Sequence, residues 1–284
     1  MNLPLVSINC PTFKHDDYIE DCIKGFLMQE TNFEFEINIC DDCSPDTTPE
    51  IVNKYVHDHP KGYRIKYWRH EQNIGMMKNG LFSLSKCTSK YTALCEGDDY
   101  WTDPHKLQKQ VDFLEANPEY VLCFTGYKIR NEFTGQEAEH IPNPQSIDVE
   151  AMIKQNIYST ATAVFLSEYM NPIPEWFSKM VFGDWSLYIN VLFTSKKKAW
   201  CLEDITSVYR IHPGGVHGNL HASNKKLIKA YKQHIDFYKA IQANLLKEKY
   251  SEIVDQCIVE RKKIITSLLY KERDFVGVVL NKFF

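Results

Sequence analysis

Short apolar segments with the length of buried strands alternate with helix-like segments through the first 125 residues. The helical stretches between them have apolar residues at helical spacing or begin at a proline suited to a first turn. Alternation of strand and helix requires right-handed crossovers and produces a largely parallel sheet. This pattern predicts the α/β fold class. The five predicted strands are Leu3–Asn9, Phe35–Cys40, Arg64–Trp68, Tyr91–Cys95 and Tyr120–Thr125.

The second half of the chain is less regular. Residues 130–146 are polar and rich in turn residues, which predicts a loop. A strand at Thr162–Leu166, a helix at Trp176–Val191 and a strand at Ser207–Ile211 are expected next. From Leu220 onward the spacing is helical to the end. We therefore expect one α/β domain with a helical C-terminal extension.

Composition excludes several classes of protein. A hydrophobic content of 44% over 284 residues is enough for a sizeable core, and the net charge of −4 provides no basic field to attract nucleic acid. No run approaches the roughly 18 to 20 apolar residues of a membrane span, and the first residues lack the features of a signal peptide. Nine scattered cysteines do not form a disulfide framework. We expect a reduced, cytoplasmic protein.

Three carboxylates follow the predicted strand Tyr91–Cys95, namely Glu96, Asp98 and Asp99. Ligands bind outside the carboxyl ends of strands in an open α/β sheet. Crowded carboxylates repel each other, and a divalent cation relieves that repulsion. Oxygen ligands suit Mg²⁺ or Mn²⁺, and Mg²⁺ is commonly shared with substrate phosphates. The cluster predicts a metal-bound nucleotide diphosphate, although Gly and Asp are also common in ordinary turns.

A second predicted strand also ends in acids, at Asp41, Asp42 and Asp46. Cys40 and Cys43 form a C-x-x-C pair here, which can indicate zinc or redox chemistry. No second such pair and no nearby histidine completes a site, so Asp42 as a hydrogen-bond acceptor for a base or ribose fits better. The alternative is a plain turn before the next helix.

Four motifs occur in the order and spacing of the family-2 glycosyltransferases, which this chain therefore resembles. They are V-S-I-N-C-P-T from Val6, I-C-D-D-C-S-P-D from Ile39, Asn73-Ile-Gly75 with Lys78-Asn79, and E-G-D-D-Y-W-T-D-P-H-K-L from Glu96. The resemblance implies a GT-A fold, with a mostly parallel central sheet flanked by helices. It would comprise a domain of residues 1–219, divided into a nucleotide-binding half (1–125) and an acceptor-binding half (126–219), followed by the helical extension 220–284.

The resemblance also implies roles in donor binding. Pro11 and Thr12 would line the base pocket, Asp42 would bond the base, usually uracil, and Lys78 would lie near the base or the phosphates. Glu96, Gly97 and Asp98 occupy the D-x-D position, where the first acid touches ribose and the later ones hold the metal. Glutamate at the first place departs from the family pattern. Asp98 and Asp99 are therefore the preferred ligands of Mn²⁺ or Mg²⁺.

In the second half, Phe182-Gly-Asp-Trp-Ser-Leu187 resembles the family segment that carries the catalytic base. This assigns to Asp184 the removal of the acceptor proton. The alternative is an ordinary helix N-cap, a position that suits aspartate.

A glycine-rich segment, Val208-Tyr-Arg-Ile-His-Pro-Gly-Gly-Val-His217, resembles the Y-R-x-H segment of the family. His212 is the third proposed metal ligand, with His217 in reserve. Arg210 would either neutralise a phosphate or pair with a core acid.

The expected activity is an inverting, metal-assisted transfer of sugar from a nucleotide-diphosphate donor, a UDP-sugar by family resemblance. The acceptor would be a hydroxyl on a growing glycan or a lipid-linked saccharide. A nucleotidyltransferase would carry a glycine-rich, arginine-bearing loop after the first strand, where this chain has Pro11-Thr-Phe-Lys-His15. A dehydrogenase would carry G-x-G-x-x-G there. A non-catalytic carbohydrate-binding protein would not need acids at two strand ends.

The C-terminal region is basic, with 13 Lys and Arg against 7 Asp and Glu from Leu220 onward. Lys225, Lys226, Lys229 and Lys232 lie beside an apolar stripe. This surface could contact anionic lipid on the inner face of a membrane. The alternative is a solvated helix that packs on its own domain or on a second copy, as in a homodimer.

Overall fold

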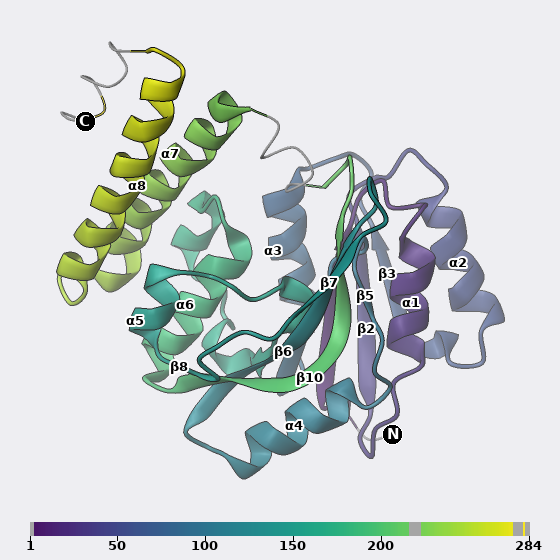
Figure 1. Ribbon diagram of the computed structural model, residues 1–284. Coiled ribbons are helices and arrows are strands. Elements are labelled where there is room, and N and C mark those ends of the chain that lie inside the picture. Colours follow the sequence, from purple (N-terminus) through teal and green to yellow (C-terminus); the bar gives the residue numbers. More distant parts are fainter. Residues whose placement is uncertain (1–2, 216–222, 275–280, 282–284) are drawn as a thin grey trace.

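The structure is a computed structural model that describes residues 3–215, 223–274 and 281. Its centre is one mixed sheet with helices on both sides (Figure 1). The strands are β1 (Val6–Thr12), β2 (Phe35–Asp41), β3 (Ile65–Arg69), β4 (Tyr91–Leu94), β5 (Tyr100–Trp101), β6 (Tyr120–Asn131), β7 (Glu137–His140), β8 (Ser146–Ile147), β9 (Val164–Leu166) and β10 (Lys198–Ile211). The α-helices are α1 (Ile19–Leu27), α2 (Thr48–Asp58), α3 (Met76–Lys86), α4 (Lys106–Ala116), α5 (Val149–Lys154), α6 (Gly183–Ser195), α7 (Asn224–Ile241) and α8 (Ser251–Lys271).

The first 125 residues contribute four neighbouring parallel strands, in the order β3-β2-β1-β4. Strand β9 runs antiparallel to both β4 and β6, while β6 and β10 are parallel to each other. Two reversals of direction therefore make β6 and β10 parallel to β1, and their carboxyl ends lie at the same edge of the sheet. We call this side the carboxyl edge.

Two apolar cores lie on the two faces of the sheet. One packs β1, β2 and β4 against α1, α2 and α4, with alternate residues such as Ile8 and Ile37 fully buried. The other joins β6 to α5 and α6 and includes Phe237 and Tyr238 of α7. The C-terminal helices therefore share a core with the α/β part, and Figure 1 shows them stacked outside α5 and α6.

Three details differ from the sequence prediction. The expected loop at 130–146 contains β7, because the end of β6 turns back at Asn131 to form a hairpin, and it ends at the first residue of β8, which pairs with β10. The expected helix 176–191 is a 3-10 turn (Glu175–Lys179) and then α6, since Phe182 is extended. The expected strand 207–211 is the end of the fourteen-residue β10, whose register shifts between Leu202 and Ser207 interrupt the alternation of burial. The division between residues 219 and 220 lies outside the described residues, as does His217.

Candidate active site

The carboxyl edge gathers most of the residues that the sequence singles out. The loop 96–99 follows β4, and Asp42 follows β2, while His212 follows β10. Two backbone bonds attach the loop to β1, from Cys95 N–H to the Asn9 carbonyl and from Gly97 N–H to the Pro11 carbonyl, each 3.1 Å long. The first and fourth strands thereby hold the acidic loop in a fixed position.

Gly97 is required by close packing. A Cβ atom at this position would lie 2.5 Å from Thr12 Oγ1 and 2.8 Å from His15 Nδ1. These two atoms are 3.0 Å apart and hydrogen-bonded to each other. Pro11, Thr12 and Gly97 are thus brought together as expected, and His15 joins them. His15 is not among the site residues expected from the sequence, because its position depends on the fold of the 12–15 turn.

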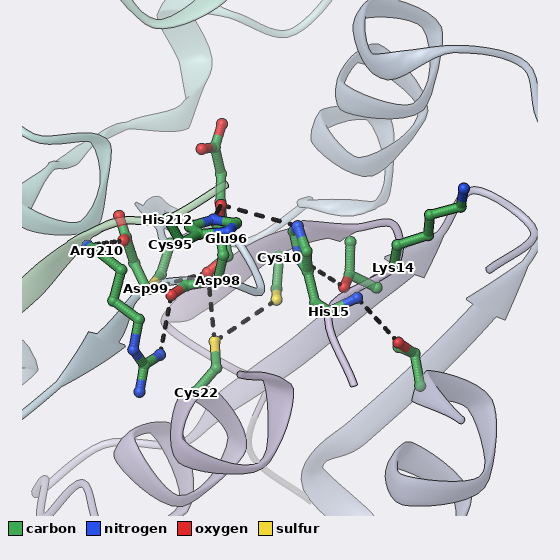
Figure 2. Close-up of polar contacts among 12 residues, drawn as sticks. Cys10, Lys14, His15, Cys22, Cys95, Glu96, Asp98, Asp99, Arg210 and His212 are labelled. Carbon is green, nitrogen blue, oxygen red and sulfur yellow. Dashed lines mark hydrogen bonds and ion pairs between the residues drawn. The ribbon is translucent and has the colours of Figure 1, made fainter. Parts of the chain in front are cut away.

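Two histidines converge on Asp98, as Figure 2 shows. Its Oδ2 atom lies 3.0 Å from His212 Nε2 and 3.8 Å from His15 Nε2. Burial alone would raise the pKa of Asp98, but the His212 hydrogen bond and the charges of both histidines outweigh it and lower the pKa. Its other oxygen, Oδ1, is buried and has no hydrogen-bond partner among the described residues.

Asp99 points into the protein and is 1% exposed. Its Oδ1 atom accepts the Arg210 backbone N–H at 2.9 Å, and its Oδ2 atom is buried without a partner among the described residues. Burial first, and then the charge of Asp98, raise the pKa of Asp99 well above its usual value. The group is therefore poorly stabilised as an anion in the absence of a further positive charge.

Arg210 holds this loop through its side chain. Its guanidinium donates to the Asp98 carbonyl at 2.9 Å and to Asp21 Oδ2 at 2.5 Å. It also lies 4.2 Å from the ring centroid of Tyr100 and is 5% exposed. Of the two roles expected for Arg210, the geometry displays pairing with an acid, but its side-chain partner Asp21 is exposed and not a core acid.

The charge of Asp184, from the other half of the chain, acts on the acidic loop. Burial raises the pKa of Glu96 to about 8, and the charges of Asp98 and Asp184 add to the shift. The pKa of the Tyr209 phenol is raised by burial and then by the charges of Asp99, Glu96, Asp98 and Asp184. The charges of all four acids therefore act on Tyr209. Tyr209 belongs to the Y-R-x-H segment, but the family resemblance implied no role for it.

The N-cap interpretation of Asp184 is wrong in position, because Phe182 occupies the cap of α6 and Asp184 lies in the first turn. The Asp184 Oδ2 atom accepts the side-chain amide of Asn156 at 2.9 Å. Asn156 follows α5, so two segments of the second half fix the orientation of this carboxylate.

Asp42 organises the segment that follows β3. Its two oxygens accept the N–H groups of Ile74 and Gly75 at 2.7 and 2.9 Å, and its side chain is buried. Lys78 lies exposed in the first turn of α3. Beside this segment is a cavity of about 480 Å³ lined by His70, Glu71, Gln72 and Ile74. A contact of Asp42 or Lys78 with a base stays a prediction.

The expected ligand trio of Asp98, Asp99 and His212 does not form a ready-made cage. Among the described residues, no group of three or more His, Cys, Asp or Glu side chains is arranged to hold a metal ion. His212 is bonded to Asp98, and one oxygen of Asp99 is occupied by Arg210. Asp98 Oδ1 and Asp99 Oδ2, which have no partner among the described residues, nevertheless suit a hard divalent cation that takes its remaining ligands from phosphate and water.

Comparison with known families now decides the classification. The family model described as "Glycosyl transferase family 2" matches residues 7–170. The chain belongs to this family. The expected family is thereby confirmed and, at the level of family, so is the expected enzyme class.

Curated relatives extend this likeness beyond the family match. An uncharacterized protein of Mycobacterium tuberculosis is 32% identical over 224 residues, which are 78% of this chain and 63% of that protein. The chain thus spans less than two thirds of that relative. The putative teichuronic acid biosynthesis glycosyltransferase TuaG of Bacillus subtilis is 27% identical over 84% of this chain and 92% of its own. The Escherichia coli UDP-Glc:alpha-D-GlcNAc-diphosphoundecaprenol beta-1,3-glucosyltransferase WfaP is 28% identical over 76% and 81%.

Two solved structures share the fold. Residues 1–349 of S. aureus TarS, in complex with UDP-GlcNAc, superpose with a TM-score of 0.61 at 14% identity, over 96% of this chain and 89% of that one. The mannosyltransferase PcManGT from Pyrobaculum calidifontis, in complex with GDP-Man and Mn²⁺, also gives 0.61 at 14% identity, over 99% and 79%. The α/β sheet with a GT-A arrangement and a helical C-terminal extension is therefore confirmed.

Proposed function

We propose that this protein transfers a sugar from a nucleotide-diphosphate donor to an acceptor hydroxyl, with inversion at the anomeric carbon. The observation that carries the proposal is the convergence of the Asp184 charge on Glu96 of the loop 96–99 in a family-2 chain. The two groups come from different halves of the sequence. Such a convergence suits a reaction in which one half holds the donor and the other activates the acceptor.

The donor would bind along the carboxyl edge. Pro11 and Thr12 would border the base, together with Asp42 and the segment that Asp42 holds, and Lys78 would face the base or the phosphates. Gly97 permits close approach of the loop to β1, and Glu96 and Asp98 would face the ribose and the diphosphate. The position of these residues around one edge supports this assignment.

Mn²⁺ or Mg²⁺ would be held by Asp98 and Asp99 with His212, and the diphosphate would supply further ligands. When bound, such a cation stabilises negative charge on the leaving diphosphate. The buried, unpartnered carboxylate oxygens support this assignment, as does the Mn²⁺ in the complex of PcManGT. Arg210 keeps the loop in place from behind.

Asp184 would act as general base, with Asn156 fixing its orientation. In a single displacement, the acceptor oxygen forms a bond to the anomeric carbon while the bond from that carbon to the phosphate oxygen breaks. The acceptor proton passes to Asp184, and the nucleoside diphosphate leaves with the electron pair. These changes balance without any further reactant.

A UDP-sugar is the proposed donor and a lipid-linked saccharide the proposed acceptor. WfaP carries both in its name, and TarS was solved with UDP-GlcNAc. PcManGT was solved with GDP-Man, so guanine is the competing base.

A donor screen tests this function. UDP-, GDP- and dTDP-sugars would be offered with Mn²⁺, and both binding and release of nucleoside diphosphate would be measured for the wild type and Asp184→Asn. We expect binding of a UDP-sugar by both proteins and a loss of turnover of roughly 10²-fold or more in the variant, the usual contribution of a general base. A matched control is Asp148→Asn, at the cap of α5 and outside the acidic cluster. Full turnover in Asp184→Asn would refute the assignment of Asp184 as the base. Binding of a sugar nucleotide by the wild type without any turnover would refute the proposed enzyme activity.

A further inference from the structure

The positive charge of the C-terminal helices is concentrated at one end of the pair. The segments 224–232 and 262–274 contain eight Lys and Arg against two Asp and Glu, a net charge of +6. The remaining residues 233–261 contain four against five, a net charge of −1. We call the first group the basic end.

The two segments of the basic end are adjacent in space. The Asn224 side-chain amide donates to Glu272 Oε1 at 2.8 Å, so the start of α7 lies beside the end of α8. A small apolar core, which includes Ile228 and Leu268, joins the two helices there. Seven cationic side chains of this end are exposed, namely Lys225, Lys226, Lys229, Lys232, Lys263, Lys271 and Arg273. The packed ends of α7 and α8 therefore display a dense positive surface.

The basic end lies on the same side of the molecule as the carboxyl edge. In Figure 1, α7 begins and α8 ends on the side to which the carboxyl ends of β1 and β10 point. Exposed apolar side chains lie on this side as well. Ile264 and Tyr270 belong to α8, at 37% and 52% exposure, and Met76 at 68% begins α3.

We propose that the basic end docks on the surface of an anionic lipid bilayer and turns the carboxyl edge toward it. Clustered Lys and Arg are attracted to anionic headgroups, and interfacial Tyr and aliphatic side chains gain from partial burial there. Docking would present a lipid-linked acceptor to Asp184, and this consequence rests on the proposed function. The contact with the bilayer does not itself rest on the proposed function.

A second copy of this chain is a poorer occupant of the basic end. A twofold interface places the same patch on both subunits, so two positive surfaces would face each other and repel. Nucleic acid would satisfy the charge but would leave Ile264 and Tyr270 without an apolar partner. A bilayer satisfies both kinds of side chain.

Vesicle co-sedimentation of the full chain tests the proposal without donor or acceptor. The probes are phosphatidylcholine vesicles with and without phosphatidylglycerol. The variant Lys225→Glu/Lys229→Glu changes the basic end, and Lys239→Glu/Lys247→Glu makes the same change of charge on exposed residues of the other end. All four substitutions lie on exposed positions, and a glutamate near the start of α7 is favourable to the helix.

We expect binding only to the phosphatidylglycerol vesicles, weakened by salt. The basic-end variant should bind roughly tenfold or more weakly, because each basic residue near an anionic surface contributes about 1 kcal/mol. The control should bind as the wild type does. No binding by the wild type, equal loss in both variants, or self-association that depends on Lys225 and Lys229 would overturn the proposal. UDP binding in solution should be unchanged in the basic-end variant, so failure of docking and failure of the proposed function give different results.

Discussion

At the scale of single residues, the site depends on charges held in low-dielectric surroundings. Asp98 is kept ionised by two histidines, while Glu96 and Asp99 have raised pKa values because they are buried beside it. Such opposed shifts within one cluster are characteristic of functional sites. The types of these residues and their place after a strand were readable from the sequence. The place of His15 was not, since only tertiary structure brings it to Asp98.

Gly97→Ala tests the close packing of the acidic loop. The new methyl group would overlap Thr12 Oγ1 and His15 Nδ1, so we expect destabilisation by about 1–3 kcal/mol and weaker UDP binding. Urea unfolding and calorimetry would measure both. Gly80→Ala is the matched control, since a Cβ there meets nothing within 4 Å and alanine favours the helix. Equal effects in the two variants would contradict the packing account.

Lys106 predicts a pH dependence of stability. It is fully buried, it donates to Gln110 and its ammonium lies 4.5 Å from the ring centroid of Trp101. Burial lowers its pKa to about 7. Between this value and the usual pKa of an unfolded lysine, the unfolded chain binds more protons than the folded one, so stability rises with pH.

We expect the wild type to gain about 2 kcal/mol from this group between pH 7 and pH 9, an order-of-magnitude figure from proton linkage. Lys106→Met should lack this gain, and urea unfolding at the two pH values would measure the difference between the proteins. Parallel pH profiles for wild type and variant would show that the lysine titrates normally.

At the scale of elements, the position of Asp184 depends on how α6 packs. Trp185, the next residue, donates its indole N–H to the Met152 carbonyl at 2.6 Å and stacks on Phe237 of α7 at 4.6 Å between ring centroids. The sequence indicated a helical extension from its apolar stripe. It did not reveal that this stripe supports the start of α6, because periodicity identifies a buried face without naming what covers it.

Phe237→Ala should therefore reduce both stability and sugar transfer. Removal of a buried phenyl ring typically costs about 3–5 kcal/mol. The loss of the ring that packs against Trp185 would also displace Asp184. The transfer rate per folded molecule would therefore fall below that of the wild type. Ile228→Ala, in the separate small core between α7 and α8, should lower stability but leave transfer by the folded protein intact. The same transfer rate per folded molecule in both variants would contradict this coupling.

At the scale of the whole molecule, the carboxyl edge unites two halves with different organisation. The parallel strands of the first half were predictable because short apolar segments alternate there with helix-like segments, although β1 spans Val6–Thr12 rather than the expected Leu3–Asn9. The second half was less so: β10 spans fourteen residues with shifts in register, and β7 forms a hairpin from polar residues that resemble a loop. Local patterns fail where pairing with a distant strand decides the conformation.

The central claim is that the carboxylates of the loop 96–99 hold a nucleotide diphosphate through a divalent cation. Calorimetric titration of UDP into the wild type and Asp98→Asn, each with Mn²⁺ and with excess chelator, tests it most directly. We expect chelation to weaken UDP binding to the wild type by roughly tenfold or more, and UDP binding to Asp98→Asn to show little further dependence on Mn²⁺. Equal UDP affinity in all four titrations would contradict it.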